Sequence, residues 1–254
     1  MEGIKRKPFQ GVSNIVRFNW QFYVFAAIAL LTLFFAQQIL PITLHFYITL
    51  FIILSTLAVI MSLSASYYIY DVSNLYTLDW LHFPASVPKK IVTINAGFDE
   101  TSALLVQKYP NACLEVFDFY DPTKHTEVSI ERARRAYPSF PGTITISTTN
   151  IPLKEDSTDV IFLILAAHEI RNEVERVMFF KQLQKALTLN GKIIVVEHQR
   201  DLANFLAYNF GFFHFHSNKT WKNAFQNSNL ILEKEFKITP FISTFILNKN
   251  GITS

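Results

Sequence analysis

The chain has 254 residues, of which 50% are hydrophobic and 17% are charged, and its formal net charge is +3. This length suits one ordinary globular domain together with an additional apolar segment. Four basic side chains and one acidic side chain lie in residues 1–19, and the charges of the remaining chain balance. This balance argues against a nucleic-acid partner. The single cysteine, Cys113, excludes an intrachain disulfide.

An uncharged stretch extends from Phe18 to Tyr70 and contains no Asp, Glu, Lys or Arg. One membrane span needs roughly 20 apolar residues, so the stretch is long enough for two. Two glutamines and Pro41 interrupt it, which predicts a transmembrane hairpin over residues 20–63 with helices at 20–37 and 42–63. A cleaved signal peptide fits poorly, because no small-residue cleavage site follows and a second apolar segment comes at once. A soluble, buried hairpin is the other alternative.

Basic residues flank only the start of this hairpin. Lys5, Arg6, Lys7 and Arg17 lie in the leader, residues 1–19, whereas the loop between the two helices is uncharged. Basic flanking segments stay on the cytoplasmic side of a membrane, so we expect the N-terminus and all residues after the hairpin to be cytoplasmic. The predicted location is therefore a multi-pass membrane protein with two spans and a cytoplasmic domain.

Aromatic residues dominate the connector, residues 64–90, which joins the hairpin to the domain. They are Tyr67, Tyr68, Tyr70, Tyr76, Trp80 and Phe83. Rings with polar tips favour the headgroup layer, which predicts an interfacial anchor. A lid over a hydrophobic substrate that leaves the bilayer is the alternative. Pro84 and Pro88 mark the boundary before the folded domain.

Apolar strands and helical segments alternate from Ile91 onward. Strands are predicted in "IVTIN", "CLEVFDF", "GTITIS", "STDVIFLILAAHEI" and "KIIVVEH". Helices are predicted in "ETSALLVQKYP", "TEVSIERARRAY" and "NEVERVMFFKQLQKAL", and "TLNG" is expected to end the last of them. The apolar face of that helix is predicted to carry Val174, Val177, Met178, Leu183 and Leu187. This alternation predicts an α/β fold, a Rossmann-like and mostly parallel sheet with helices on both faces.

Polar residues follow the predicted strands at the positions where such sheets bind ligands. The first strand ends at a turn that contains Gly97, and the second ends in Asp118. Asp118 lies about 20 residues beyond the turn, which is the spacing of a carboxylate that binds a ribose diol. The third strand ends in "STTN", whose side chains can reach an adenine edge, and the last two end in "AAHEI" and "EHQRD". These residues predict one site along one edge of the sheet.

The segment resembles the class I S-adenosylmethionine-dependent methyltransferases over roughly residues 91–247. The resemblance is most specific in "IPLKEDSTDVIFLILAAHEIRNEVERVMFFKQLQKALTLNGKIIVVEH", which is similar to the family's run from strand three to strand five. "HFHSNKTWKNAFQNSNLILEKEFKI" is similar to the family's C-terminal helix before an antiparallel strand pair, and "ITPFISTFILNK" is expected as the edge strand. The resemblance implies a methyltransferase-like domain over residues 91–254 with S-adenosyl-L-methionine as its cofactor. It assigns to cofactor binding Asn95, Ala96, Gly97, Asp118, Phe119, Thr148, Thr149, Asn150 and Ala166.

The glycine loop departs from the family's pattern of an acid at the end of strand one followed by three alternating glycines. Aligned on Gly97, this sequence has Thr93 in place of the acid, Asn95 in place of the first glycine and Asp99 in place of the third. Asparagine tolerates the left-handed backbone better than most residues, so Asn95 is compatible with the turn. We expect Asp99 or Glu100 to replace the missing acid beside the ammonium group of the cofactor.

Methyl transfer to a hydroxyl group requires a residue that removes a proton. His168 follows strand four, and Glu197 and His198 end strand five, so these three residues are the catalytic candidates. Histidine can act as a base near neutral pH. The alternative is structural for each, and His168 in particular is suited to cap the following helix.

An aromatic insert, "RDLANFLAYNFGFFHFH", precedes the C-terminal helix. It is predicted to form a wall of the acceptor pocket or to dip into the membrane, and a helix that covers the core is the alternative. His214 and His216 lie in it without a nearby acid or cysteine, so we expect no metal site. Arginines in "ERARR", residues 131–135, are expected on a solvated helix face, with contact to anionic lipid as the alternative. The substrate-binding candidates are Glu169, Asn204, Tyr208, His214 and His216.

Two functions of different classes follow. The preferred one is a membrane-anchored methyltransferase that acts on a hydrophobic small molecule or a lipid, because a soluble acceptor would not require the hairpin. The alternative is a catalytically inactive methyltransferase-like protein that serves as a membrane binding or scaffold protein, as Thr93, Asn95 and Asp99 suggest. A nicotinamide-dependent reductase is disfavoured, because the third glycine and a Tyr-x-x-x-Lys pair are missing. The sequence says nothing about the accepting atom or the oligomeric state.

Overall fold

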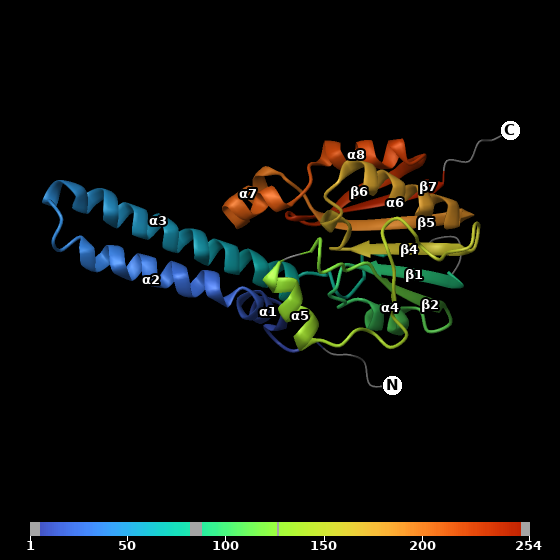
Figure 1. Cartoon of the computed structure of the whole chain (residues 1–254), viewed down its shortest axis with the longest axis horizontal. Coiled ribbons are helices and arrows are strands. Elements are labelled where there is room, and N and C mark those ends of the chain that lie inside the picture. Colours follow the sequence, from blue (N-terminus) through green and yellow to red (C-terminus); the bar gives the residue numbers. More distant parts are fainter. Residues whose placement is uncertain (1–5, 82–87, 126, 250–254) are drawn as a thin grey trace.

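A helical hairpin projects from one end of an α/β domain in the computed structural model, which describes residues 6–81, 88–125 and 127–249 (Figure 1). The hairpin consists of α2 (Trp20–Ala36) and α3 (Ile42–Tyr67). A helix that the sequence did not predict, α1 (Gln10–Phe18), precedes it within the basic leader. Phe83 and Pro84 of the connector lie outside the described residues.

The helix α3 continues through one π-helical turn, η1 (Tyr68–Val72), so it is longer than predicted. Within the described chain, this 31-residue helix is the one that is long and apolar enough to cross a membrane by itself. The helix α2 reaches such a length only together with α1, and these two are bent by 71°. None of the most apolar window of α3 is buried, so the alternative of a soluble, buried hairpin is wrong. Large exposed side chains on both helices include Phe22, Phe25, Leu31, Phe46, Phe51 and Leu54.

Seven strands form one sheet in the order β3-β2-β1-β4-β5-β7-β6. The parallel strands are β1 (Lys90–Asn95), β2 (Cys113–Asp118), β3 (Ile144–Thr145), β4 (Thr158–Ile164) and β5 (Leu187–His198). The predicted Rossmann-like, mostly parallel sheet with an antiparallel C-terminal part is confirmed. The last strand is not the edge, however, because β7 (Ile242–Lys249) lies antiparallel between β5 and the edge strand β6 (Leu230–Thr239).

The predicted turn after the long amphipathic helix is part of β5. Thr158 pairs with Leu187, whereas Val160 pairs with Lys192, so the residues between Leu187 and Lys192 bulge from the strand. Gly191 lies in this bulge, where a Cβ atom would come within 2.9 Å of the carbonyl oxygen of Thr158. The bulge therefore requires a glycine for packing, and the sheet runs on through the segment.

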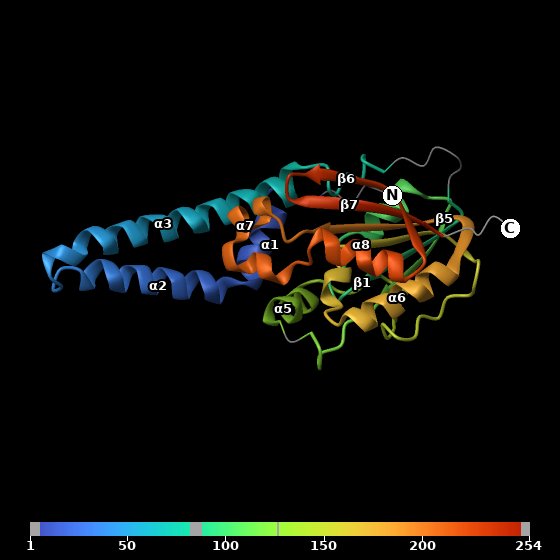
Figure 2. The same ribbon diagram turned by 90° about the horizontal axis from the view of Figure 1, so that it is seen from above.

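One face of the sheet is covered by α6 (Glu173–Ala186) and α8 (Asn218–Asn227) (Figure 2). The helix α6 begins after Asn172, whose side chain accepts a hydrogen bond from the backbone N–H of Glu175. The predicted apolar face of this helix is wrong in part, because Val174 is 68% exposed and Met178 is 47% exposed. The buried face carries Leu183 as predicted, together with Phe179 and Phe180, and these three pack in one cluster with Trp221 and Phe225 of α8.

The other face of the sheet is covered by α4 (Ser102–Lys108) and by the connector. Four aliphatic residues of the connector, at 69, 75, 78 and 81, are buried in one cluster with Ile91, Val160 and Phe162 of the sheet. Tyr70, Tyr76 and Trp80 pack against the same cluster, whereas Tyr67 and Tyr68 are exposed. Within its described residues, the connector therefore packs on the sheet from Ile69 to Leu81.

The carboxyl ends of the parallel strands face the base of the hairpin. The helix α5 (Val128–Ala136) contacts α1 at this edge, and α7 (Leu202–Tyr208) contacts α3 (Figures 1 and 2). Two short 3₁₀ helices, η2 (Ala167–Glu169) and η3 (Asn209–His214), complete the edge. Four of the predicted site residues, His168, His198, Tyr208 and His214, thus line a cavity between the sheet and the hairpin.

Candidate functional site

A cavity of about 430 Å³ lies between the carboxyl edge of the sheet and the base of the hairpin. Its walls come from α1, the end of α3, α5 and the aromatic insert. A volume of this size falls in the range of small-molecule sites, which starts at roughly 300 Å³. The lining includes Ile15, Phe18, Ser66, Tyr70, His168, His198, Tyr208, His214 and Phe215.

His168 enters this cavity from the end of β4 and is held by the end of β5. Glu197 is fully buried and accepts hydrogen bonds from the backbone N–H groups of Ala166 and His168. Its other oxygen lies 2.7 Å from the Nδ1 atom of His168. Burial favours the neutral ring, but the carboxylates of Glu197 and Glu169 outweigh burial and raise the pKa of His168 to about 10. A protonated ring cannot accept a proton, so His168 does not fit the predicted role of base in this state, and Glu197 positions it.

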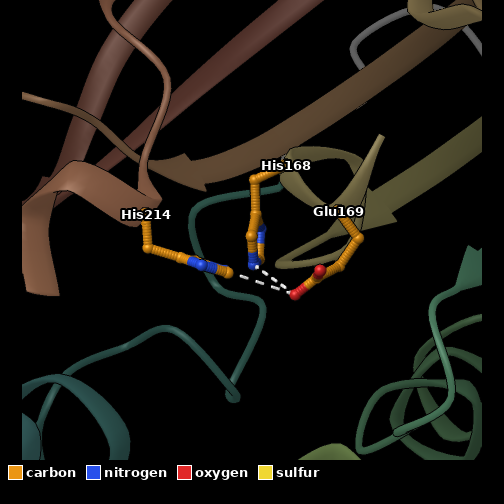
Figure 3. Close-up of side chains that lie close together, drawn as sticks. All are labelled: His168, Glu169 and His214. Carbon is orange, nitrogen blue, oxygen red and sulfur yellow. Dashed lines mark ion pairs between the residues drawn. The ribbon is translucent and has the colours of Figure 1, made fainter. Parts of the chain in front are cut away.

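His168, Glu169 and His214 form a cluster at the rim of the cavity (Figure 3). The Oε1 atom of Glu169 lies 3.3 Å from Nε2 of His168 and 3.4 Å from Nε2 of His214. The Nδ1 atom of His214 lies 3.1 Å from Oε1 of Glu127, at the start of α5. Burial opposes the charge of Glu169, but hydrogen bonds from both histidines hold its pKa well below the usual range. Burial likewise opposes the charge of His214, and Glu127 and Glu169 raise its pKa above the usual value.

His198 belongs to a separate hydrogen-bonded chain whose direction is fixed by Asn204. The amide nitrogen of Asn204 donates to Asp201 and to the carbonyl oxygen of Phe241, each at 3.0 Å, so its oxygen is left to accept. The Nδ1–H group of His198 therefore donates to Asn204 at 2.9 Å, and Nε2 accepts from the Tyr70 hydroxyl at 2.9 Å. Burial is the main cause that lowers the pKa of His198 to about 4. His198 is consequently a neutral imidazole at physiological pH.

Part of the aromatic insert lines the 430 Å³ cavity, through Tyr208, His214 and Phe215. Phe215 stacks on the ring of His198 at a centroid distance of 4.6 Å, and the edge of Tyr208 meets the same ring at 5.3 Å. Phe210 and Phe213 of the insert are 85% and 56% exposed beside the hairpin. The insert therefore lines the cavity with some rings and leaves others uncovered.

His216 does not join His214, although two residues separate them in sequence. The Nε2 atom of His216 lies 3.1 Å from the guanidinium of Arg176, and its ring meets Trp221 edge-on. Burial and the charge of Arg176 lower the pKa of His216 to about 3. The structure thus assigns His216 to packing between α6 and α8, away from the substrate site that the sequence predicted.

The turn after β1 is tight and has a left-handed backbone at its glycine. Gly97 has φ +100°, and its N–H group donates to the side chain of Asn95 at 3.1 Å. Asn95 thus stabilises the turn as predicted. One carboxylate oxygen of Asp99 accepts from the N–H groups of Thr101 and Ser102 at the start of α4. Its other oxygen is buried and has no hydrogen-bond partner among the described residues.

Asp118 is satisfied by protein groups where the sequence predicts a ribose. One oxygen accepts from the backbone N–H of Tyr120 at 2.9 Å, and the other is paired with Arg134 of α5. The Arg134 guanidinium also lies 3.3 Å from the carbonyl oxygen of Gly97 and 4.5 Å from the centroid of the Tyr120 ring. "ERARR" is therefore not simply a solvated face, because its central residues anchor α5 over the sheet edge.

A hollow of about 160 Å³ lies beside Gly97 at the end of β1. It adjoins the 430 Å³ cavity, because Phe98, Ile130 and Leu165 line both. A Cβ atom at Gly97 would lie 3.0 Å from the ring of Tyr120 and 3.1 Å from Ile130 of α5, so the turn is closely packed on that side.

A second hollow of about 250 Å³ lies where an adenine was expected, beyond β2 and β3. Thr148 lines it and is hydrogen-bonded to Glu175, whereas Thr149 and Asn150 are exposed and do not line it. Phe119 is buried against Phe179 and His125. Ala96 lines the hollow beside Gly97, and Ala166 is buried with its N–H group on Glu197. Tyr120 lines this second hollow and not the one beside Gly97.

The strand order and the reversed β7 define the class I methyltransferase fold. No sequence model of a protein family matches the chain, and a search of curated sequences finds no relative. The solved structure of LaPhzM superposes with a TM-score of 0.51 at 17% identity, covering 75% of this chain and 57% of that chain. A SAM-dependent methyltransferase from Aquifex aeolicus (TM-score 0.46, 10% identity) covers 65% of this chain and 85% of its own. The PH0226 protein from Pyrococcus horikoshii OT3 (TM-score 0.48, 12% identity) covers 77% and 91%, respectively. At these identities the similarity concerns the fold alone.

Several residues of the site were not predicted from the sequence. Tyr70, Glu127 and Arg134 come from segments that were interpreted as anchor or surface, and Arg171 contacts His214 from the loop before α6. The three arginines at residues 132, 134 and 135 were the sequence feature that could have indicated these contacts, because a short helix with three positive charges is expected to contact acidic residues.

Proposed function

We propose that the chain is a membrane-anchored, S-adenosylmethionine-dependent methyltransferase that acts on a hydrophobic small molecule or a lipid. The observation that carries the proposal is the 430 Å³ cavity, which lies between the strand ends and the base of an exposed apolar hairpin. An acceptor embedded in a bilayer would approach along the hairpin. The exposed rings of the insert, Phe210 and Phe213, favour insertion into the same apolar layer.

The cavity contains a hydrogen-bonded chain that can orient an acceptor hydroxyl. Tyr70 lines the cavity and donates to the neutral His198 ring, whose opposite nitrogen is held by Asn204. Burial lowers the pKa of His198 to about 4, so the ring is a weak proton acceptor at neutral pH and serves to fix the Tyr70 hydroxyl. The oxygen of that hydroxyl can in turn accept a hydrogen bond from an acceptor hydroxyl.

The cofactor requires a rearrangement of α5. The turn at Gly97 and the unpartnered oxygen of Asp99 suit the amino-acid end of an adenosyl sulfonium, but Arg134 occupies the carboxylate that would bind its ribose. Binding therefore requires that the Arg134–Asp118 pair opens.

The test uses the full-length chain in detergent or in vesicles. Purified protein is titrated with S-adenosylhomocysteine and is then incubated with methyl-labelled S-adenosylmethionine and a lipid extract of the host cell. The proposal expects saturable binding and label in the organic phase. Asp118→Asn should abolish both, whereas Asp156→Asn, which changes an exposed acid 67% accessible at its side chain, should change neither. A folded protein that shows neither binding nor transfer would instead favour the inactive membrane scaffold.

A further inference from the structure

The cluster of His168, Glu169 and His214 has the composition of a transition-metal site. Two imidazoles and one carboxylate are the three protein ligands of many zinc and non-haem iron centres, in which the remaining positions stay open. All three ligand atoms lie within 4.8 Å of one another. The cluster borders the 430 Å³ cavity, so open positions would face a space large enough for a substrate group.

The distances within the cluster also fit a shared cation, because the hydrogen bonds to Glu169 are long. Charge-assisted hydrogen bonds between nitrogen and oxygen span roughly 2.7–2.9 Å. The Oε1 atom of Glu169 is instead 3.3 Å and 3.4 Å from the two Nε2 atoms. A tetrahedral ion with ligands at about 2.0–2.1 Å separates neighbouring ligand atoms by roughly 3.3 Å. Both measured separations match that tetrahedral edge.

The opposite nitrogen of each histidine is held by a further carboxylate. Glu197 contacts Nδ1 of His168 at 2.7 Å, and Glu127 contacts Nδ1 of His214 at 3.1 Å. A carboxylate behind each imidazole fixes its ring and increases the basicity of the nitrogen that binds metal. Both Nε2 atoms are consequently oriented toward the same Glu169 oxygen, as Figure 3 shows. This double arrangement is an observation independent of the three ligands themselves.

One cation of the protein already competes for the cluster. The guanidinium of Arg171 contacts the His214 ring and lies 2.8 Å from its Nε2 atom. Arg171 is exposed, so its side chain can move into solvent when an ion takes its place. Removing the Arg171 charge should therefore favour metal binding.

We propose that His168, Glu169 and His214 bind one divalent transition-metal ion, held by Nε2 of each histidine and by the Glu169 carboxylate. Glu197 and Glu127 act as positioning residues for the two rings. The ion would face the cavity with an open position, where it can polarise an oxygen of the acceptor. This revises the expectation, based on His214 and His216 alone, that the chain has no metal site. The inference does not depend on cofactor binding or on methyl transfer.

The test is direct titration of the full-length, metal-stripped chain with Zn²⁺ at neutral pH, in competition with a chromophoric chelator and without S-adenosylmethionine. We expect one ion per chain, and Co²⁺ in the same site should show the absorption of a tetrahedral complex with nitrogen and oxygen ligands. His214→Ala and Glu169→Gln should each weaken Zn²⁺ binding at least tenfold. Glu127→Gln should weaken it by roughly 10–100-fold, as is usual for a carboxylate behind a metal-binding histidine.

His216→Ala is the matched control, because it removes a neighbouring histidine that contacts Arg176 instead of the cluster. It should leave Zn²⁺ affinity unchanged, and Arg171→Ala should increase it. Circular dichroism of each variant reports whether the fold is retained. The proposal is overturned if the folded wild-type chain binds no stoichiometric Zn²⁺, or if His214→Ala and His216→Ala have equal effects on binding.

Discussion

Arg134 pairs with Asp118, the carboxylate that is predicted to bind the ribose of the cofactor, so Arg134→Ala tests this contact most directly. Removing one partner of a buried ion pair costs about 3–5 kcal/mol of unfolding free energy. The Asp118 side chain is 4% exposed, but that of Arg134 is 32% exposed, so solvent weakens the pair. We therefore expect Arg134→Ala to lower the free energy of unfolding by roughly 2 kcal/mol.

The same free energy should reappear as affinity for the cofactor. If α5 must release Asp118 before binding, the closed pair reduces the apparent affinity by the free energy needed to open it. About 2 kcal/mol corresponds to a gain of up to roughly 30-fold in the affinity of Arg134→Ala for S-adenosylhomocysteine. Isothermal titration of the full-length wild type and of the variant measures this difference, and urea unfolding measures the loss of stability.

Arg135→Ala is the control, because Arg135 lies on the same helix, is 78% exposed and pairs only with the exposed Glu131 in the described structure. It should change stability by less than about 0.5 kcal/mol and leave affinity unchanged. Equal or weaker binding by a folded Arg134→Ala would refute the idea that α5 gates the cleft. An equal gain by Arg135→Ala would refute it too, because the effect would then be one of net charge.

Three further predictions concern the turn, the buried histidine and the hairpin. Gly97→Ala should destabilise the protein in urea by about 1–3 kcal/mol more than Gly142→Ala, because both have positive φ but only Gly97 is packed against a ring; equal losses would contradict this. Burial gives His198 a pKa of about 4 in the folded chain, against 6.5 when the chain is unfolded. The neutral ring therefore contributes roughly 3 kcal/mol to the free energy of unfolding, a contribution that is complete above pH 6.5 and is lost as the pH falls toward 4. His198→Gln should reduce the decrease in the free energy of unfolding between pH 6.5 and pH 4. An unchanged decrease would rule out His198 as its source. Leu54→Arg in α3 should release the chain from carbonate-washed membranes, because a central arginine costs about 2.5–3.5 kcal/mol there; Leu189→Arg, at a site 75% exposed in the β5 bulge, should not, and retention of both variants would argue against a span.

The order of strands and helices could be predicted because each element has a local signal. Pro110 and Pro138 follow the ends of α4 and α5, and Asn172 caps α6. The buried face of α6 was harder to predict, because Val174 and Met178 have the same apolar character as Phe179 and Phe180. Tertiary packing decides between such faces. The same limit explains β7, whose place between β5 and β6 depends on long-range pairing rather than on its own residues.

The site was predictable only at the level of strand ends. His168 lies shortly after β4, and Glu197 and His198 are the last residues of β5, so topology alone brings them to one edge. Other contacts in the site come from elements whose position over this edge cannot be read from nearby residues. Arg134 and Glu127 of the α5 region, which contact Asp118 and His214, are examples. The pKa of His168 depends on the close approach of Glu197 and Glu169, and for this reason a general base could not be distinguished from an imidazolium in the sequence.

The leucines of the connector have a practical consequence for how the protein can be shortened. Leu75, Leu78 and Leu81 are at most 6% exposed and lie against the sheet, where a helix would otherwise be needed. Deleting everything before residue 88 to obtain a water-soluble fragment would expose the apolar residues on one face of the sheet and cause the fragment to aggregate. A fragment that starts near Ile69 would keep these leucines on the sheet. It should therefore be more soluble than a fragment that starts at residue 88, although both lack the hairpin.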